Sequence, residues 1–135
     1  MIEYNYKTRV RYKDIDFMGI VYYSRYYEFF EAARTDMLRY IGIPYSDFEK
    51  MGFALPVAES HCEYKKGAEF DVLLDIKCIM KNKPGARLKI SYIVTNDDTK
   101  DLIVTGYTVH AFLNSSKKPC KPPKFFIELL NKHWQ

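Results

Sequence analysis

The first residues of the chain alternate between uncharged and basic side chains. Tyr4, Tyr6, Thr8, Val10 and Tyr12 fall on one face, and Lys7, Arg9, Arg11 and Lys13 fall on the other. A period of two residues is typical of a half-buried β-strand. The pattern therefore predicts a strand over residues 4–13, whose basic face is either solvated or in contact with an anionic partner.

A different period follows, in which large apolar residues recur every three or four positions. Tyr26, Phe29, Phe30, Ala33, Met37 and Ile41 form this stripe. It predicts an amphipathic helix of roughly 17 residues. Ser24 is the expected N-cap, because its hydroxyl can accept a hydrogen bond from a first-turn N–H. Gly42 should supply a left-handed stop, and Pro44 should prevent the helix from resuming.

The remainder of the chain is predicted to be mostly strand. Extended runs cover Ala54–Tyr64, Phe70–Met80, Leu88–Thr95 and Leu102–Leu113, with turn sequences such as Asn82–Gly85 between them. A short C-terminal helix follows Pro122 and Pro123. Short connections favour antiparallel neighbours, and the long apolar helix needs a sheet face to cover. We therefore expect one α+β domain over residues 1–135.

Composition and charge narrow the function classes. The 135 residues are 47% hydrophobic, which is enough to bury the core of one domain. The net charge of +4 indicates a local attraction for anions rather than a protein that coats nucleic acid. Cys62, Cys78 and Cys120 lack the spacing of a metal site and are expected to be free thiols. With neither a signal-peptide pattern nor a membrane-spanning stretch, we expect a cytoplasmic protein.

Candidate chemistry gathers between the first strand and the helix. Asp14 and Asp16 stand where the strand should end, and a glycine turn and the helix start follow. Unpaired N–H groups at a helix start suit a carbonyl oxygen that gains negative charge. A nearby carboxylate can attack that carbonyl or deprotonate water. Alternatively, both aspartates only organise the turn or cap the helix, and the residues alone leave both interpretations open.

The pattern D-x-D-x-x-G-x-V-Y-Y-x-x-Y-x-x-F-F-E-x-A-R runs from Asp14 to Arg34. It resembles the opening motif of the 4-hydroxybenzoyl-CoA thioesterase-like branch of the hotdog-fold thioesterases. The likeness continues more loosely through Leu55-Pro56-Val57, the segment 64–68 and Asp71, and so covers most of the chain. The resemblance implies a hotdog fold, in which a curved antiparallel sheet of about five strands wraps one long helix.

The resemblance also implies roles for individual residues. The family's catalytic aspartate falls on Asp16, which would act on a thioester carbonyl as nucleophile or as general base, while Asp14 would be structural. The backbone N–H of Tyr23 would polarise the carbonyl oxygen. Many members have a histidine in place of Tyr23, and Gly67 replaces a proline that is common in relatives. The implied activity is acyl-CoA thioester hydrolysis without a metal or redox cofactor.

An acyl-CoA substrate would need cationic side chains for its phosphates. By rough alignment Lys83 and Arg87 are the best candidates and Lys66 is another, although each could be an ordinary solvated charge. Acyl carrier protein is an alternative acyl donor. The resemblance further implies a homodimer with active sites at the interface, often paired into a homotetramer. We expect neither nucleic-acid binding nor membrane insertion.

Three rival interpretations remain. His61, flanked by Glu59 and Glu63 at alternate positions, could belong to a metal site, although no second histidine is near in sequence. A hotdog hydratase or dehydratase would need a histidine beside the carbonyl, and the sequence near Asp16 has none. A non-catalytic binder of acyl thioesters or nucleic acid would use the basic and tyrosine side chains without needing Asp16.

Overall fold

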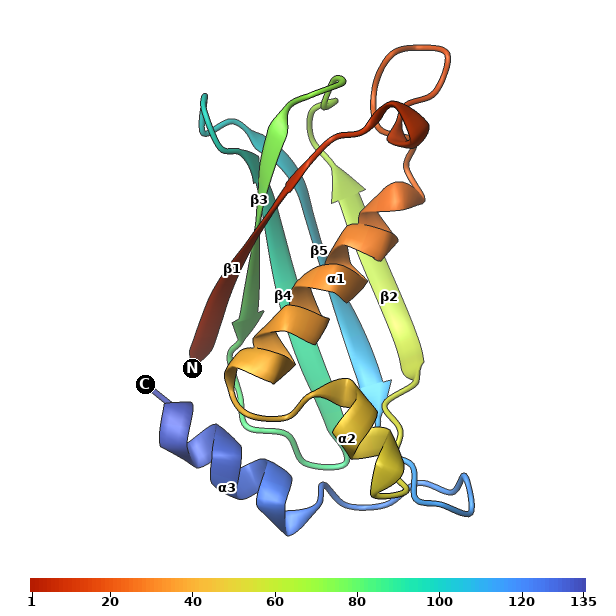
Figure 1. The fold of residues 1–135 in the computed structure, drawn as a ribbon, viewed down its shortest axis with the longest axis vertical. Coiled ribbons are helices and arrows are strands. Elements are labelled where there is room, and N and C mark those ends of the chain that lie inside the picture. The colour runs from red at the N-terminus through yellow and green to blue at the C-terminus, as the bar shows by residue number, and fades with distance from the viewer.

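The computed structural model describes all of residues 1–135 as a curved antiparallel sheet that wraps one long helix (Figure 1). The elements are β1 (Ile2–Arg9), α1 (Arg25–Tyr40), α2 (Tyr45–Lys50), β2 (Val57–Tyr64), β3 (Leu73–Met80), β4 (Arg87–Asn96), β5 (Leu102–Ala111) and α3 (Lys124–His133). The strand order is β1-β3-β4-β5-β2, and every neighbouring pair is antiparallel. The predicted α+β hotdog architecture is therefore confirmed.

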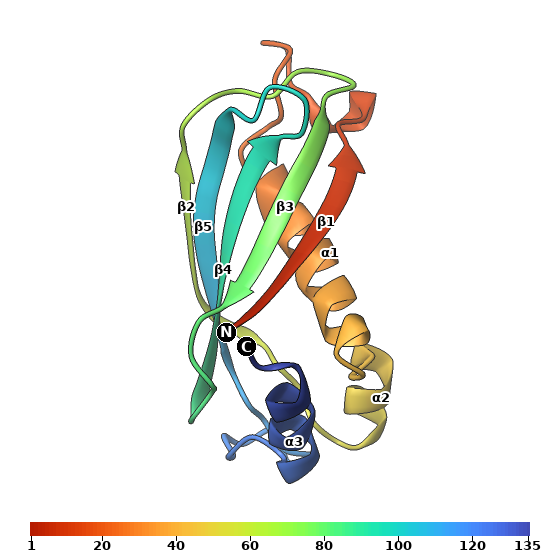
Figure 2. The ribbon, with the colours of Figure 1, turned by 90° about the vertical axis from the view of Figure 1, so that its left-hand side faces the viewer.

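Helix α1 lies across the concave face of the sheet (Figure 2). Its apolar stripe is buried as predicted, and Phe30 stacks on Tyr92 of β4 with the ring centroids 4.2 Å apart. At Gly106 of β5 a β-carbon would lie 2.9 Å from the Phe30 ring and 2.5 Å from the His61 carbonyl oxygen. Only glycine leaves room for the helix here, so this position sets how closely α1 approaches the sheet.

Several strands are shorter than the sequence predicts. β1 ends at Arg9 rather than Lys13, because a 3₁₀ turn over Tyr12–Asp14 follows it. β3 begins at Leu73 rather than Phe70, since Asp71 adopts a positive φ of 70° that a strand cannot contain. β2 begins at Val57 rather than Ala54. Each difference is at a strand end, where side-chain hydrogen bonds compete with the sheet.

The ends of α1 partly follow the prediction. Gly42 has a φ of 98° and supplies the expected left-handed stop. Ser24 occupies the N-cap position as predicted, but its side chain does not make the expected capping hydrogen bond. The prediction for Pro44 is wrong, because α2 begins directly after it. Proline lacks an N–H that a helix start would leave unpaired anyway, so it suits this position.

The two ends of the molecule differ. The turn that contains Asp16 and the start of α1 lie at one end, and α2 and α3 close the other (Figure 1). β2 is an edge strand that pairs only with β5, and seven of its eight residues are exposed. The side of β2 that faces α1 is therefore left largely uncovered by the chain itself. None of the helices has the length and apolar content needed to span a bilayer.

Candidate active site

Asp16 lies at the base of a tight turn that leads from β1 towards α1. The Gly19 N–H donates to the Asp16 carbonyl oxygen at 2.9 Å, and the Asp16 N–H donates to the Ile20 carbonyl oxygen at 3.0 Å. Gly19 has a φ of 81°, a conformation that glycine adopts without strain. An antiparallel bridge between Ile15 and Val21 closes the turn. The backbone thus holds Asp16 close to the helix start.

The two aspartates of the motif have different surroundings. Asp14 is only 2% exposed, and its carboxylate accepts hydrogen bonds from the Arg11 N–H at 2.9 Å and Lys13 Nζ at 3.2 Å. Asp16 is half-buried, and its Oδ1 accepts the Met18 N–H at 2.8 Å. Its Oδ2 takes part in none of the hydrogen bonds. Asp14 is therefore committed to holding the turn, whereas Asp16 keeps one carboxylate oxygen for a reactant.

The start of α1 provides unused hydrogen-bond donors. The N–H groups of Tyr23 and Ser24 donate to no acceptor, whereas the next one, from Arg25, donates to the Tyr22 carbonyl oxygen at 2.9 Å. The Tyr64 hydroxyl donates to the Tyr23 carbonyl oxygen at 3.2 Å and ties the helix start to β2. The positive end of the helix dipole lies here as well. This backbone can stabilise an oxygen that becomes negatively charged.

Asp16 and Tyr23 line the same pocket, which has a volume of about 360 Å³. Its walls are mostly apolar and aromatic, and include Ile20, Val21, Tyr22, Tyr26 and Tyr64. Burial raises the pKa of Tyr26, and burial followed by the Cys62 thiol raises that of Tyr64. These phenols therefore stay protonated at neutral pH. They give the pocket hydroxyl donors and ring faces without adding charge.

Gly67 forms part of this pocket wall, and sequence reasoning gave it little importance. A β-carbon at this position would lie 2.8 Å from Ile20 Cγ2. The adjacent Ala68 carbonyl oxygen accepts the Val21 N–H at 2.9 Å. The segment around Gly67 therefore packs directly on the turn that carries Asp16. In this chain a residue with a β-carbon at position 67 would have to displace Ile20 or the turn.

The three predicted phosphate-binding residues lie at two opposite ends of the folded molecule. Lys66 lines the Asp16 pocket, and its Nζ pairs with Asp101 at 2.7 Å, which lowers the pKa of that carboxyl group. Lys83 lies at the opposite end, with its Nζ 5.4 Å from the centre of the Trp134 ring. Arg87 begins β4 at that same end. A single chain therefore brings only Lys66 together with Asp16 and Tyr23.

Glu59, His61 and Glu63 share the outer face of β2, as their spacing predicts. His61 stacks on Tyr107 with the ring centroids 5.3 Å apart, and the Tyr107 hydroxyl donates to Glu59 at 3.4 Å. No group of three or more histidine, cysteine, aspartate or glutamate side chains is arranged to hold a metal ion. These three residues thus contact the sheet surface and lie away from the Asp16 pocket.

The three cysteines are free thiols, as expected. Burial raises the pKa of Cys78 to about 12 and also raises that of Cys62. A thiol reacts as a nucleophile in its thiolate form. Neither side chain is therefore an activated nucleophile.

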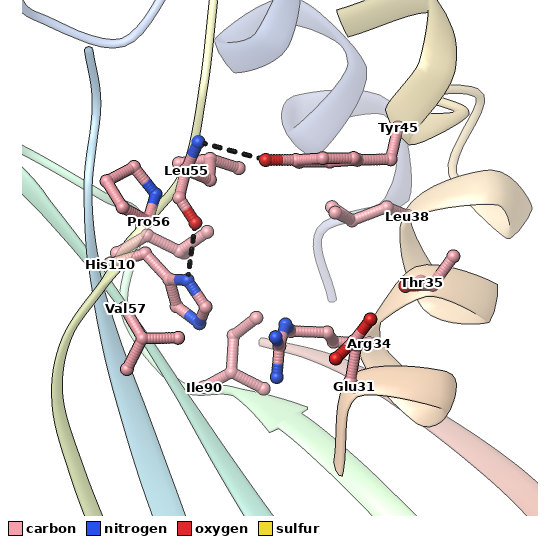
Figure 3. Close-up of a pocket in the computed structure, with 11 residues that line it drawn as sticks. Glu31, Arg34, Thr35, Leu38, Tyr45, Leu55, Pro56, Val57, Ile90 and His110 are labelled. Atoms are coloured by element: carbon pink, nitrogen blue, oxygen red, sulfur yellow. Dashed lines mark hydrogen bonds between the residues drawn. The ribbon is translucent and has the colours of Figure 1, made fainter. Parts of the chain in front are cut away.

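A second pocket, of about 260 Å³, lies between the later turns of α1 and strands β2, β4 and β5 (Figure 3). Sequence reasoning missed it: Glu31 and Arg34 end the quoted motif, but His110 and the strand residues that face them come from distant segments. Arg34 and Leu38 of α1 face Leu55, Ile90 and His110 across this space. We refer to it as the Arg34 pocket.

A chain of hydrogen bonds runs beneath the Arg34 pocket. It links Tyr92 Oη to Thr108 Oγ1 at 2.7 Å, Thr108 Oγ1 to His110 Nε2 at 2.8 Å, and His110 Nδ1 to the Leu55 carbonyl oxygen at 3.0 Å. Since a carbonyl oxygen only accepts, His110 Nδ1 carries a proton. Burial lowers the pKa of His110, so the ring is neutral and Nε2 accepts from Thr108. The Tyr92 hydroxyl then donates to Thr108, and every donor points towards Leu55.

Comparison with known proteins agrees with this architecture. Residues 10–130 match the family model of the thioesterase-like superfamily. The acyl-CoA thioester hydrolase YbgC of Escherichia coli is 30% identical over 124 residues, covering 92% of each chain. A hypothetical protein of Aquifex aeolicus has a solved structure that is 31% identical, covers 94% of this chain and 98% of its own, and superposes with a TM-score of 0.88.

A DHNA-CoA thioesterase from Staphylococcus aureus is 26% identical and has a TM-score of 0.87, covering all of this chain and 97% of its own. The family match spans most of the chain and includes the Asp16 turn, α1 and strands β2 to β5. The chain therefore belongs to the thioesterase-like superfamily and is a hydrolase of that family.

Proposed function

We propose that the protein hydrolyses an acyl-CoA thioester to free CoA and a carboxylic acid, with Asp16 as the reacting side chain. One observation carries this proposal: the unpaired Asp16 Oδ2 and the unused Tyr23 N–H line one pocket. A carboxylate and an oxyanion donor on either side of a carbonyl are the two groups that acyl transfer needs. The name of the Escherichia coli relative supports the same substrate type.

The thioester carbonyl oxygen would accept the Tyr23 N–H, which stabilises the negative charge that develops there. Asp16 then either attacks the carbonyl carbon or removes a proton from an attacking water. In the first route the C–S bond breaks, CoA leaves as a thiolate, and water hydrolyses the mixed anhydride. In the second route hydroxide adds directly and the thiolate leaves. In both routes the thiolate finally takes up a proton.

The CoA phosphates would contact Lys66, whose ion pair with Asp101 can exchange for a phosphate. Lys83 and Arg87 could reach the same substrate only from a second copy of the chain. CoA is the expected carrier, and acyl carrier protein is the alternative. The free thiols suit a reducing compartment such as the cytoplasm.

A homodimer through β2 would complete the site. β2 has an unpaired edge, and Tyr64, Tyr23 and Tyr22 beside it are each at least 46% exposed. Phe17 at the tip of the Asp16 turn is 99% exposed. Surfaces of this kind are usually covered by a partner. Light scattering coupled to size-exclusion chromatography should give the mass of a dimer or of a dimer pair, and a monomer would contradict this part of the proposal.

The decisive experiment is a thiol-release assay with acyl-CoAs of several chain lengths, an aroyl-CoA and acyl carrier protein. Asp16→Asn should lower kcat by about 10²- to 10⁴-fold, the usual contribution of such a group, while CoA binding and circular dichroism stay unchanged. Asp71→Asn is the matched control, because Asp71 is an exposed carboxylate outside the pocket. Near-normal turnover by Asp16→Asn would refute this mechanism.

A single-turnover reaction in heavy-oxygen water would separate the two routes. In the nucleophilic route water that attacks the aspartyl carbonyl of the anhydride leaves its label in the peptide containing Asp16. In the general-base route the label enters only the released acid. Label in the Asp16 peptide, detected by mass spectrometry of the digested protein, therefore identifies the nucleophilic route, because the general-base route cannot label the protein.

A further inference from the structure

The Arg34 guanidinium is a half-buried cation that forms no ion pair within 4.0 Å in the chain. Its polar neighbour within the chain is the neutral Tyr92 hydroxyl, and the charge of Arg34 and a hydrogen bond from it partly offset the rise in the Tyr92 pKa that burial causes. Its nitrogens point into the pocket towards Ile90, which lies between them and the ring of His110 in this view (Figure 3). A guanidinium has five N–H donors in a planar fork that matches a carboxylate. The donors that Tyr92 does not use are open to a ligand that enters the pocket.

The charges around Arg34 favour an anion. Burial holds His110 neutral by lowering its pKa, and it raises the pKa of Tyr92 to about 12, so neither ring carries charge at neutral pH. Glu31, one turn earlier on α1, lines the rim; its side chain is exposed and forms no ion pair with Arg34. The other lining residues are uncharged. Arg34 is therefore the one cation that lines the pocket, and the exposed Glu31 is its one carboxylate.

The location of the pocket connects it with the reaction. Val57 at the start of β2 lines the Arg34 pocket, and Tyr64 at the end of β2 lines the Asp16 pocket. If the β2 edges of two chains pair antiparallel about a two-fold axis, the Tyr64 end of one strand lies beside the Val57 end of the other. The Arg34 pocket of one chain then opens beside the Asp16 pocket of its partner.

We propose that the Arg34 pocket receives the far end of the acyl group from the partner's active site and selects acyl groups that end in a carboxylate. The proposal rests on the proposed thioesterase function and names its substrate class. The pocket volume of about 260 Å³ suits the end of a chain rather than a nucleotide. Apolar walls from Leu38, Leu55 and Ile90 hold the methylene groups, and the guanidinium binds the terminal carboxylate in a bidentate pair.

The test uses acyl-CoAs of matched chain length that end in a methyl, a hydroxyl or a carboxylate group. Wild-type protein should hydrolyse the carboxylate-ended substrate with a kcat/KM at least tenfold above the methyl-ended one. Arg34→Met should remove most of this preference, and Arg34→Lys should restore part of it, because lysine keeps the charge but loses the fork. Arg39→Met is the matched control, since Arg39 is exposed on the same helix and pairs with Asp36.

Mixed dimers test the contribution in trans. A dimer of one Asp16→Asn chain and one Arg34→Met chain has one site with both residues intact only if they act across the interface. Mixing the two variants should then recover hydrolysis of the carboxylate-ended substrate above the sum of the separate variants. If mixing recovers nothing, the assignment to the partner's site is wrong.

The remaining outcomes are also decisive. An equal preference in wild-type and Arg34→Met protein, or a hydroxyl-ended substrate that matches the carboxylate-ended one, would overturn the inference while leaving thioesterase activity intact. An absence of thiol release from all three substrates would instead refute the proposed function. In that case calorimetry would still test the selectivity of the pocket, by comparing the affinities of wild-type and Arg34→Met protein for the same three acyl-CoAs.

Discussion

At the start of α1 the pocket around Asp16 is built from turns and exposed aromatic rings, whereas the Arg34 pocket is built from regular helix and strand. In the first pocket the N–H groups of Tyr23 and Ser24 and one oxygen of Asp16 have no partners. In the second, Tyr92, Thr108 and His110 are joined in a continuous chain of hydrogen bonds. Helix α1 therefore has backbone N–H groups without acceptors at its start, and its later turns pack beside a fully hydrogen-bonded side-chain network.

This difference indicates how the two regions can divide one reaction. Unpaired donors and acceptors cost stability, so they persist where a bound reactant later satisfies them. A fully bonded network fixes the shape of a pocket and leaves a single open group, Arg34, to choose what fits. The Asp16 pocket is thus suited to chemistry, and the Arg34 pocket is suited to recognition. Each of the following experiments changes one pocket and leaves the other as an internal reference.

The largest effect is expected from Gly67→Val. A β-carbon at this position would clash with Ile20 Cγ2 at 2.8 Å and displace the turn that carries Asp16. We expect a loss of about 1–3 kcal/mol in the free energy of unfolding, and a fall in kcat of about 10²-fold if the turn moves by an ångström. Gly85→Val is the matched control, because a β-carbon there meets no atom within 4 Å. Equal losses in both variants would show that Gly67 does not position the turn.

Thr108→Val should act on the Arg34 pocket. Valine has nearly the same shape but leaves the Tyr92 hydroxyl and His110 Nε2 without their partner. Leaving buried polar groups unpaired costs about 1–3 kcal/mol, which chemical denaturation would measure. Thr105→Val on the same strand is the control, since the Thr105 hydroxyl makes no hydrogen bond and is only half-buried. If the two variants unfold at the same denaturant concentration, the network contributes nothing to stability.

A smaller effect is expected from Tyr64→Phe at the Asp16 pocket. The change removes the hydrogen bond at 3.2 Å to the Tyr23 carbonyl oxygen, together with the interaction of the hydroxyl with the Cys62 thiol, and keeps the aromatic ring. A bond of this kind is worth about 0.5–1.5 kcal/mol, so kcat/KM should fall by about 2- to 10-fold, mainly through kcat. Tyr12→Phe, at an exposed ring outside the pocket, is the control. A fall in stability without any change in kcat would mean that the bond holds the fold but does not orient the helix start.

The comparison also shows which features the sequence can reveal. The period-two run in β1, the apolar stripe of α1 and the stop at Gly42 are local patterns, and the structure confirms them. The contrast between Asp14 and Asp16 could be expected only from the resemblance. Spacing alone treats the two carboxylates alike, and burial distinguishes them.

Other features depend on tertiary contacts that no local pattern encodes. The Arg34 pocket joins α1 to residues in three strands, and His110 lies 76 positions from Arg34 in the sequence. Ser24 has the right residue type for a cap, but its helical backbone turns the hydroxyl away from that role. Pro44 was expected to end helical structure, yet the aromatic contacts of Phe48 with Phe126 favour a second helix there. At these positions tertiary packing, rather than intrinsic helix propensity, determines the local structure.

The smallest expected effect is a pH dependence of the free energy of unfolding that comes from the Arg34 pocket and not from the Asp16 pocket. His110 in the Arg34 pocket has a lowered pKa, chiefly through burial, so the unfolded chain binds a proton at a higher pH than the folded chain does. Stability is therefore fully present above the ordinary histidine pKa near 6.5 and declines as the pH falls from there towards the folded pKa. Denaturation at a series of pH values from about 7.5 to 5 should show this decline, because a buried neutral histidine must become charged.

His110→Gln should be less stable than wild type at pH 7.5 and should lose less stability on acidification, because it no longer carries the titrating ring. His61→Gln is the control, since His61 is an exposed ring on the outer face of β2. If His110→Gln and wild type decline in parallel, the decline has another origin, such as the carboxyl groups of Asp97 and Asp101, whose pKa values lysine neighbours lower. Those carboxylates lose their stabilising contribution as they are protonated, at a lower pH than His110. A decline that begins near pH 6.5 and disappears in His110→Gln therefore assigns it to the Arg34 pocket, independently of any substrate.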